Sequence, residues 1–419
     1  MASELIDIAV VGCGVSGATV ALTAAQNHAS VAVFEEHPNI GIPSHCSGHV
    51  GIQAFKQYGP SLPKRIVENE IKGAMLYAPN GKSLGLKRAE PVTWVLNRVE
   101  LDRYLATRAT RNGAVLSTNS RVEGFQRTED QTFRIKVGGT KPRTVQSKIL
   151  IDAGGCGGSV SRYAALSQTN RRLLVNSAQF NVENLIDVRD DLVEIYFGQK
   201  YAPGFFGWII PRRDGSAKIG IAAAARGNVR QCFERFVNKH PIVSSKLKHA
   251  KVLTSPMYHP IPVGGATERT YADGVLTVGD AASQVKPTTG GGIVFALICG
   301  RIAGETAASA IFAKDTSADR LHSYEERWRK LIGFDLAAMS WLRKMLYQLP
   351  DRYLDRIFAV SREMKADEIL SRTADIDFQG RTILSLARDP RLFITLLSAS
   401  LLSAPSLLSL GARPLRNQS

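Results

Sequence analysis

The chain of 419 residues is long enough for roughly two or three domains. Hydrophobic residues make up 44% and charged residues 21%, which excludes wholesale disorder and allows a large buried core. Lys plus Arg outnumber Asp plus Glu by 53 to 37, and the net charge of +16 favours an acidic partner, either a phospholipid surface, a phosphorylated ligand or nucleic acid.

The first elements along the chain predict one βαβ unit. Residues 6–11 form a short run rich in β-branched residues, which is typical of a buried parallel strand. The run Gly12-Cys13-Gly14-Val15-Ser16-Gly17 follows it, and a helical stretch then extends to about residue 27. A second apolar run at residues 31–34 completes the unit.

The glycines in this unit match the Gly-x-Gly-x-x-Gly pattern of dinucleotide-binding proteins. A strand before the pattern, a helix after it and an acidic residue about 20 residues further on make the match specific. Gly12 allows the tight turn, Gly14 lets the pyrophosphate approach the backbone, and Gly17 lets helix and strand pack closely. Glu35, or its neighbour Glu36, is expected to accept the hydroxyl groups of the adenosine ribose. The helix N-terminus is expected to hold the phosphates.

The middle of the chain changes character. Residues 98–112 have apolar residues at helical spacing, and strand-like segments then run to residue 152. From about residue 172 to 265, alternating apolar segments separated by turn residues predict an antiparallel sheet. Residues 275–279 form another buried strand, which opens a glycine loop and a long helix to about residue 313. The remainder, 320–419, is expected to be helical.

These patterns predict three domains in an α/β fold. We expect a Rossmann-type domain that binds a dinucleotide cofactor, an antiparallel-sheet (α+β) substrate domain interleaved with it in sequence, and a C-terminal helical cap. The predicted ranges are 1–171 with 266–319 for the cofactor domain, 172–265 for the sheet domain, and 320–419 for the helices.

The second glycine loop indicates FAD rather than NAD. Asp280 can bond a ribityl hydroxyl, and the N–H groups of residues 290–293 lie at the start of the predicted long helix. These groups are suited to the electron-rich pyrimidine end of a reduced flavin. A plain strand–turn–helix does not need an Asp-Ala-Ala sequence joined to three consecutive glycines.

Both loops together resemble the geranylgeranyl reductase family, and in particular digeranylgeranylglycerophospholipid reductases, within the class of p-hydroxybenzoate hydroxylase-like flavoproteins. The resemblance covers roughly residues 5 to 345. Its marks are Gly12–Gly17 with Glu35, residues 45–51 (His-Cys-Ser-Gly-His-Val-Gly), Arg98 with Asp102, residues 206–211 (Phe-Gly-Trp-Ile-Ile-Pro), and residues 279–293.

The resemblance implies contacts to both halves of FAD. The adenine half is expected to contact Ser16, Glu35, Arg98 and the backbone near Val122, and the flavin half Cys46, Ser47, Asp280, Gly291, Gly292 and Ile293. Arg98 is also suited on chemical grounds to a pyrophosphate or ribose. The alternative is a surface salt bridge between Arg98 and Asp102.

Two departures from the family patterns stand out. Phe206 and Ile210 replace the usual Tyr and Phe of the Tyr-x-Trp-x-Phe-Pro motif, which Pro211 ends. We still expect these residues and Trp208 to line an apolar substrate cavity, although simple core packing is the alternative for Trp208. The hydroxylase class typically carries an Asp-Gly pair before a Ser. In the corresponding segment here, residues 152–159, a glycine stands where that Asp would align. That departure, and the lack of a second Gly-x-Gly-x-x-Gly, weakens the hydroxylase interpretation and leaves no visible NADPH site.

His45 and Cys46 are the candidate catalytic residues. The resemblance implies a geranylgeranyl substrate, whose double bonds are isolated alkenes. Such an alkene accepts a hydride only if a proton reaches the other carbon, so a general acid and a dry channel are needed. Cys46 has two alternatives, a redox-sensitive thiol or simple packing on the flavin. His45, Cys46 and His49 lack the further ligands of a zinc site, so we expect no metal.

The five cysteines lack paired short spacings, and acidic residues stand near the N-terminus. Both features favour a reduced, cytoplasmic protein without a signal peptide. The uncharged segment 392–412 is long enough to span a bilayer, but its serines and Pro405 make it mediocre for that purpose. It is interpreted as a helical lid or membrane-interface segment, with a core helix and a true span as alternatives.

The leading hypothesis is an FAD-dependent reductase that saturates isolated double bonds of geranylgeranyl chains on archaeal-type ether-lipid precursors. Its expected partners are an isoprenoid lipid, an external electron donor (a ferredoxin-like protein or NADPH) and a membrane surface touched peripherally, with no nucleic acid. The alternatives are an FAD-dependent monooxygenase or halogenase of the same superfamily, and a lipid-binding or redox-sensing flavoprotein without turnover.

Overall fold

The computed structural model describes residues 5–157, 160, 166, 173–224, 227–347, 349–373 and 375–387. The segment 392–412, for which a lid or interfacial helix was predicted, lies outside the described residues.

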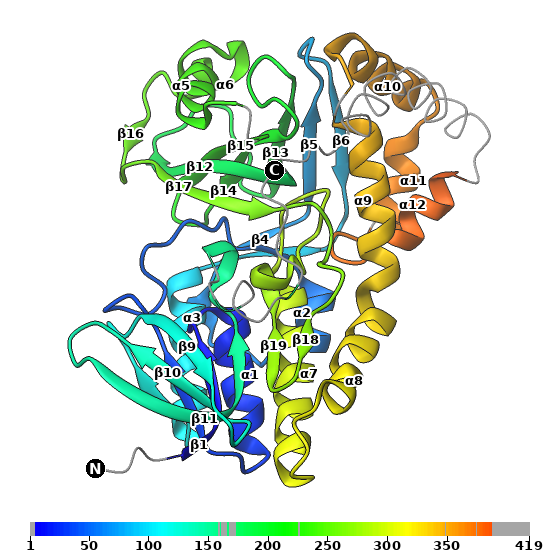
Figure 1. The fold of residues 1–419 in the computed structure, drawn as a ribbon. Helices are drawn as coiled ribbons and strands as arrows, with labels where there is room; N and C mark the ends of the chain where they lie inside the picture. The colour runs from blue at the N-terminus through cyan, green and yellow to red at the C-terminus, as the bar shows by residue number, and fades with distance from the viewer. Residues whose placement is uncertain are drawn as a thin grey trace, which may run out of the picture.

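An eight-stranded sheet contains the predicted βαβ unit (Figure 1). β1 (Leu5–Val11), α1 (Val15–Gln26) and β2 (Val31–Phe34) follow one another. β1 pairs in parallel with β2 on one side and with β11 (Arg143–Asp152) on the other, so it lies inside the sheet. Ile8, Ala9 and Val10 at its centre are fully buried, as the run of β-branched residues predicted.

Further strands extend this sheet on both sides. β8 (Val115–Ser117) pairs in parallel with β2, and β19 (Val275–Thr277) pairs in parallel with β11 and is followed in the sheet by β18 (Tyr271–Ala272). An antiparallel arm is formed by β9 (Val122–Arg127) and β10 (Phe133–Val137), which pairs with β11. The carboxyl ends of the parallel strands therefore meet at one edge, where ligands bind in such sheets.

Helices α3 (Arg98–Arg111) and α7 (Ile293–Phe312) pack beside α1. Glycines allow α7 to approach α1 closely, because a Cβ on Gly304 would lie 2.7 Å from the carbonyl oxygen of Val20. Among the described residues, α7 is the one helix long and apolar enough to cross a membrane, and most of it is buried inside the protein. It is therefore a core helix of this domain.

The second sheet also has eight strands and carries the predicted antiparallel region. Its strands from that region are β12 (Leu174–Glu183), β13 (Leu192–Phe197), β14 (Phe206–Pro211), β15 (Ala217–Ala224), β16 (Lys251–Val252) and β17 (Met257–Pro262). Helices α5 (Val229–Lys239) and α6 (Pro241–Lys246) pack against it.

Two strands of the second sheet come from much earlier in the chain. β5 (Gly73–Tyr77) pairs in parallel with β13, and β6 (Ser83–Lys87) pairs with β5. The predicted range 1–171 therefore supplies strands to both sheets. Sequence patterns did not anticipate this, because pairing between strands so far apart leaves no local signal.

A small three-stranded sheet lies between the two large ones (Figure 1). It consists of β3 (His49–Gly51), β7 (Thr93–Leu96) and β4 (Val67–Ile71). The short helix α2 (Ile52–Tyr58) follows β3. Strand β3 continues from the loop that holds Cys46, so this small sheet fixes that loop between the two domains.

The C-terminal part is helical, as predicted, over its described residues. Its helices run along one side of the molecule (Figure 1) and comprise α8 (Ala318–Trp328), α9 (Phe334–Leu346), α10 (Asp351–Glu363), α11 (Ala366–Thr373) and α12 (Gly380–Ala387). A π-helical turn, Arg329–Gly333, joins α8 to α9. The architecture confirms the predicted α/β fold with a parallel sheet, an antiparallel sheet and helices.

Candidate cofactor and substrate site

One cavity of about 1660 Å³ connects the two large sheets. Its wall includes the first glycine turn, the loop at residues 41–47, the second glycine loop at residues 288–293 and the face of β14. Residues from distant parts of the sequence therefore enclose a single space. Such a cavity, with polar groups at one end and apolar groups at the other, is typical of a cofactor and substrate site.

The first glycine turn is shaped for close backbone contact. Gly12 has a φ of +89°, and a Cβ on Gly17 would lie 2.0 Å from the carbonyl oxygen of Gly12. By contrast, a Cβ on Gly14 would meet nothing within 4 Å, so the space beside Gly14 is open. No side chain caps the N-terminus of α1. These features fit a pyrophosphate that takes its hydrogen bonds from the first turn of the helix.

Glu35 lies at the end of β2 and borders the cavity. One of its carboxylate oxygens accepts a hydrogen bond from the backbone N–H of Cys13 at 2.9 Å, and the other contacts Nδ1 of His37 at 2.6 Å. Its neighbour Glu36 is more exposed and forms an ion pair with Arg121 at 3.6 Å. Both glutamates line the cavity, but Glu35 is the one fixed to the glycine turn.

The second glycine loop meets the first one. A Cβ on Gly279 would lie 2.1 Å from Oγ of Ser16, so the turn at Gly279–Ala282 packs directly on the start of α1. Gly292 is the N-cap of α7, and no side chain caps this helix either. Two uncapped helix N-termini therefore border one cavity.

Asp280, Gly291, Gly292 and Ile293 line the cavity as predicted for contact with the flavin half. Burial raises the pKa of Asp280, and the positive charge of Arg98 opposes this change. A buried carboxyl group needs a hydrogen-bonding partner, and a ribityl hydroxyl would be a suitable one.

Arg98 lies at the start of α3 and lines the cavity with Asp102. Its guanidinium donates two hydrogen bonds to this carboxylate, at 3.0 and 3.2 Å. The salt bridge that was named as the alternative for Arg98 is therefore present, but it does not lie on the surface. Only 18% of the Arg98 side chain and 9% of the Asp102 side chain are exposed. Nε of Arg98 is buried without a hydrogen-bond partner among the described residues. The structure thus leaves a buried donor for an anionic or hydroxyl group of a cofactor.

The candidate catalytic residues lie between the two glycine segments and the second sheet. Cys46 and Ser47 line the cavity, and Sγ of Cys46 accepts a hydrogen bond from the N–H of Gly48 at 3.4 Å. The ring of His45 stacks on the ring of His259, with 3.5 Å between centroids. Burial lowers the pKa of His45 to about 3, helped by the nearby charges of His259 and Arg98, so this imidazole is neutral near pH 7.

The surroundings of His49 do not indicate a metal site. Its Nε2 contacts Oγ1 of Thr93 at 2.7 Å, and burial lowers its pKa to about 4. Among the residues that the structure describes, no group of three or more His, Cys, Asp or Glu side chains is arranged to bind a metal ion.

The apolar end of the cavity lies on the second sheet. Phe206, Trp208 and Ile210 are buried and line it, whereas Pro211, the fourth predicted substrate residue, ends the strand outside the lining. Nε1 of Trp208 donates to Oε1 of Gln179 at 3.0 Å. Trp208 therefore both packs in the core and lines the cavity.

Several functional residues were not visible in the sequence. Phe197, Phe205, Tyr347 and Phe358 complete the apolar wall from β13, the loop before β14, and the C-terminal helices. The hydroxyl of Tyr347 also donates to the carbonyl oxygen of Thr288 in the second glycine loop at 2.7 Å. Isolated aromatic residues carry no motif, so only the fold brings them together.

A buried ion pair closes the second glycine loop. Nζ of Lys286 lies 2.7 Å from a carboxylate oxygen of Asp377, and the other oxygen of Asp377 accepts from the N–H of Gly51 at 2.8 Å. Thr288 also bonds Gln379 at 2.6 Å. The segment before α12 therefore holds the glycine loop and the end of β3 together.

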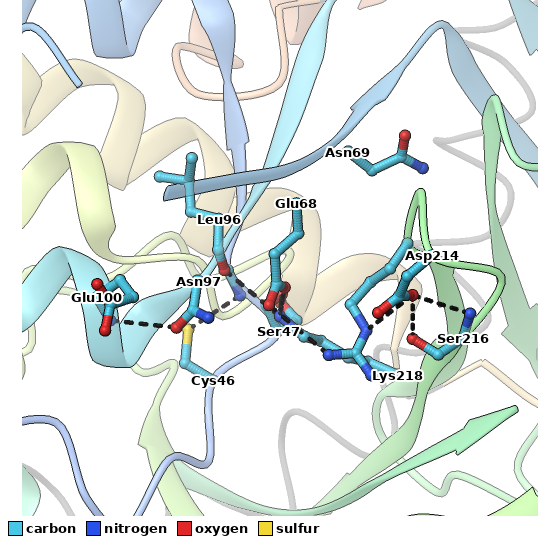
Figure 2. Close-up of polar contacts among 12 residues, drawn as sticks. Cys46, Ser47, Glu68, Asn69, Leu96, Asn97, Glu100, Asp214, Ser216 and Lys218 are labelled. Carbon is cyan, nitrogen blue, oxygen red and sulfur yellow. Dashed lines mark hydrogen bonds and ion pairs between the residues drawn. The ribbon is translucent and has the colours of Figure 1, made fainter. Parts of the chain in front are cut away.

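Lys218 of β15 reaches the Cys46 loop from the second sheet (Figure 2). Its Nζ donates to the carbonyl oxygen of Ser47 at 3.0 Å and to Oε2 of Glu68 at 2.7 Å. Neither Lys218 nor Glu68 stands out in the sequence, because a single lysine in a strand is normally solvent-exposed.

Known proteins resemble this chain over most of its length. A family model described as lycopene cyclase protein matches residues 7–377. The digeranylgeranylglycerophospholipid reductase of Methanocaldococcus jannaschii is 31% identical over 360 residues, covering 85% of this chain and 90% of that protein.

Solved structures agree with this relationship. A geranylgeranyl bacteriochlorophyll reductase-like protein from Thermoplasma acidophilum matches with a TM-score of 0.82 and 26% identity, covering 94% of this chain and 99% of that one. The halogenase PltM, solved with phloroglucinol and FAD, matches with a TM-score of 0.66 and 13% identity, covering 98% and 93%, and so shares the fold alone. The chain therefore belongs to the geranylgeranyl reductase family, which includes the digeranylgeranylglycerophospholipid reductases, within the superfamily of FAD-dependent oxidoreductases.

Proposed function

We propose that this protein is an FAD-dependent reductase that saturates isolated double bonds of geranylgeranyl chains on archaeal-type ether-lipid precursors. The observation that carries the proposal is the continuity of one cavity from the paired glycine segments to the aromatic face of β14. The relatives named digeranylgeranylglycerophospholipid reductase support the substrate class. The apolar end suits an isoprenoid chain, because it offers aromatic and aliphatic side chains from two domains.

The cofactor end fits FAD by its own chemistry. The uncapped N-termini of α1 and α7 are suited to negative charge, the open space beside Gly14 admits a pyrophosphate, and Nε of Arg98 lacks a partner among the described residues. Asp280 is placed to accept a hydroxyl hydrogen bond. A bound, reduced FAD supplies a hydride.

The remaining chemistry falls to the protein. An unactivated alkene must receive a proton as the hydride arrives, and it must do so away from water. Sγ of Cys46 is the atom that we assign to donate this proton, because it lines the cavity and the charge of Arg98 beside it stabilises the thiolate left after the transfer. His45 is less suited, since a ring with a pKa of about 3 carries no spare proton near pH 7. Trp208 and its neighbours exclude water from the substrate chain.

The direct test uses anaerobic, dithionite-reduced protein with a geranylgeranyl ether lipid. We expect a mass gain of two hydrogens for each double bond reduced. An unchanged lipid mass, with reduced flavin that stays reduced on stopped-flow mixing, would leave a lipid-binding or redox-sensing role instead. Substrate-stimulated NADPH oxidation with oxygen uptake would point to a monooxygenase or halogenase. Either result contradicts the proposal.

We also propose that the protein works at a membrane surface and takes electrons from an external donor, either a ferredoxin-like protein or NADPH. The net charge of +16 and the lipid nature of the proposed substrate support the surface contact. Sedimentation with anionic vesicles tests this, and equal binding to neutral vesicles would contradict it. Oxidation of reduced ferredoxin or of NADPH during turnover identifies the donor.

A further inference from the structure

Lys218 is a buried cation that joins the second sheet to the loop of Cys46. Only 6% of this residue is exposed. Its Nζ contacts the carbonyl oxygens of Ser47 at 3.0 Å and Leu96 at 3.4 Å, and Oε2 of Glu68 at 2.7 Å. The acceptors belong to the Cys46 loop, to β7 and to β4, so one side chain from β15 connects three other segments (Figure 2).

The charge around Lys218 is only partly neutralised. Glu68 is shared with Arg212, whose NH1 lies 3.6 Å from Oε1 of this carboxylate. The second carboxylate near Arg212, that of Asp214, lies 4.0 Å away and is mostly exposed. Burial lowers the pKa of Lys218, while the charge and the hydrogen bond of Glu68 oppose this change. A buried lysine in such surroundings is costly, so a packing role alone does not explain it.

The loop of Cys46 is held at the two residues that follow the thiol. Lys218 fixes the carbonyl of Ser47, and the next residue, Gly48, has a φ of +75° and sits where a Cβ would be 2.0 Å from the carbonyl oxygen of Leu96. The N–H of Gly48 points back to Sγ of Cys46. The thiol therefore has little freedom to move relative to the second sheet.

Two buried cations act on this thiol. Lys218 from β15 and Arg98 from α3 each have an electrostatic interaction with Cys46. Nearby positive charge stabilises the thiolate that is left when a cysteine gives up its proton, so it favours the proton donation assigned to Cys46 above. The two cations come from different domains, so this effect exists only when the two sheets are correctly docked.

We propose that Lys218 is a positioning residue for the reaction: it fixes the Cys46 loop to the substrate-binding sheet, and its charge stabilises the thiolate that Cys46 becomes when it donates its proton. The part of this inference that concerns catalysis rests on the proposed function. Its effect on thiol reactivity, however, is measured without any lipid.

The chain offers a matched control. Lys246 and Glu194 form another buried ion pair, with 2.9 Å between Nζ and Oε1, and 9% and 6% of their side chains exposed. This pair also belongs to the second domain, where Glu194 lies on β13, but neither residue lines the cavity. Lys246→Met therefore removes a similar buried charge without touching the Cys46 loop.

The experiment measures alkylation of Cys46 by iodoacetamide in the purified, flavin-loaded protein, followed by peptide mass spectrometry. We expect Lys218→Met to slow alkylation near neutral pH by about tenfold, the effect of about 1.4 kcal/mol less stabilisation of the thiolate. Lys246→Met should stay within about twofold of the parent protein, although both variants lose thermal stability.

Further variants keep the proposal falsifiable if Lys218→Met does not fold. Lys218→Gln is expected to slow alkylation in the same way, and Lys218→Arg, which keeps the charge, to restore most of the rate. On lipid, we expect the neutral variants to lower kcat more than they raise KM. Unchanged alkylation in both neutral variants, or equal slowing in Lys246→Met, would overturn the proposal. A parent protein that fails to reduce lipid would instead contradict the proposed function and leave the alkylation result readable.

Discussion

The two ends of the cavity are built in different ways. At the glycine end, the wall is backbone, and Gly12, Gly17 and Gly279 sit where no side chain fits. At the apolar end, the wall is made of large side chains such as Phe206 and Trp208 on a regular strand. The cofactor end is therefore specified by the path of the backbone, and the substrate end by the volume of its side chains. Substitutions at the first should act almost all-or-none, and those at the second should act by degrees.

The largest expected effect is at Gly17. The added Cβ in Gly17→Ala would lie 2.0 Å from the carbonyl oxygen of Gly12, a backbone atom that cannot rotate away. We expect a loss of about 3 kcal/mol or more in the free energy of unfolding, with no FAD bound. Gly14→Ala is the control, because its Cβ enters open space. It should unfold at nearly the same temperature but bind FAD more weakly, by flavin fluorescence titration. Equal stability of Gly17→Ala and the parent protein would contradict the comparison.

The next largest effect is at the other end of the cavity. Trp208→Ala should lower the free energy of unfolding by about 3–5 kcal/mol, because it leaves a large cavity in the second sheet. Trp208→Phe keeps an aromatic ring and loses mainly the hydrogen bond to Gln179, at a cost of about 1 kcal/mol. Urea denaturation measures both values, and kcat/KM for the lipid should follow the same order. Identical losses in the two variants would show that ring volume is not what this wall requires.

A pH effect is expected between the two ends, at the stacked rings of His45 and His259. Burial lowers their pKa values to about 3 and about 4, below the ordinary value of 6.5. Their contribution to stability is therefore complete above pH 6.5 and is lost as the pH falls towards these folded-state values.

Each ring contributes a slope of at most about 1.4 kcal/mol per pH unit. His259→Phe keeps a ring for stacking but removes one titrating group, so its free energy of unfolding should fall less steeply below about pH 6. Parallel curves for the variant and the parent protein would contradict the assignment. His49 and His240, whose pKa values are also lowered to about 4 by burial, titrate equally in both proteins.

The smallest expected effect is that of substituting Glu36, and it contrasts with the effect of substituting its neighbour Glu35. Glu36→Gln should change the free energy of unfolding by less than about 0.5 kcal/mol, because its ion pair with Arg121 is exposed. Glu35→Gln removes the charge that holds Cys13 and His37, and should weaken FAD binding measurably more. Titration of each variant with FAD checks the order of the two dissociation constants, and a stronger effect at Glu36 would reverse the assignment.

The sequence predicted the local parts of the site well. The βαβ unit, the turn at Gly12, the start of α7 and the three strands β13, β14 and β15 occur where expected. Arg98 lines the cavity and also forms the salt bridge with Asp102 that was named as the alternative to FAD contact. The predicted contacts to FAD and the catalytic roles of His45 and Cys46 remain predictions.

By itself, the sequence determined the elements whose signals are local: the glycine turn after a buried strand, the helix periodicities and the alternation in the second sheet. These are short-range because backbone sterics and side-chain spacing act over a few residues. Only the tertiary structure decided that β5 joins β13, that Lys218 reaches the Cys46 loop, and that Asp377 pairs with Lys286. Each of these contacts joins residues far apart in the chain, and their stability comes from burial and charge pairing that exist only once the sheets have docked.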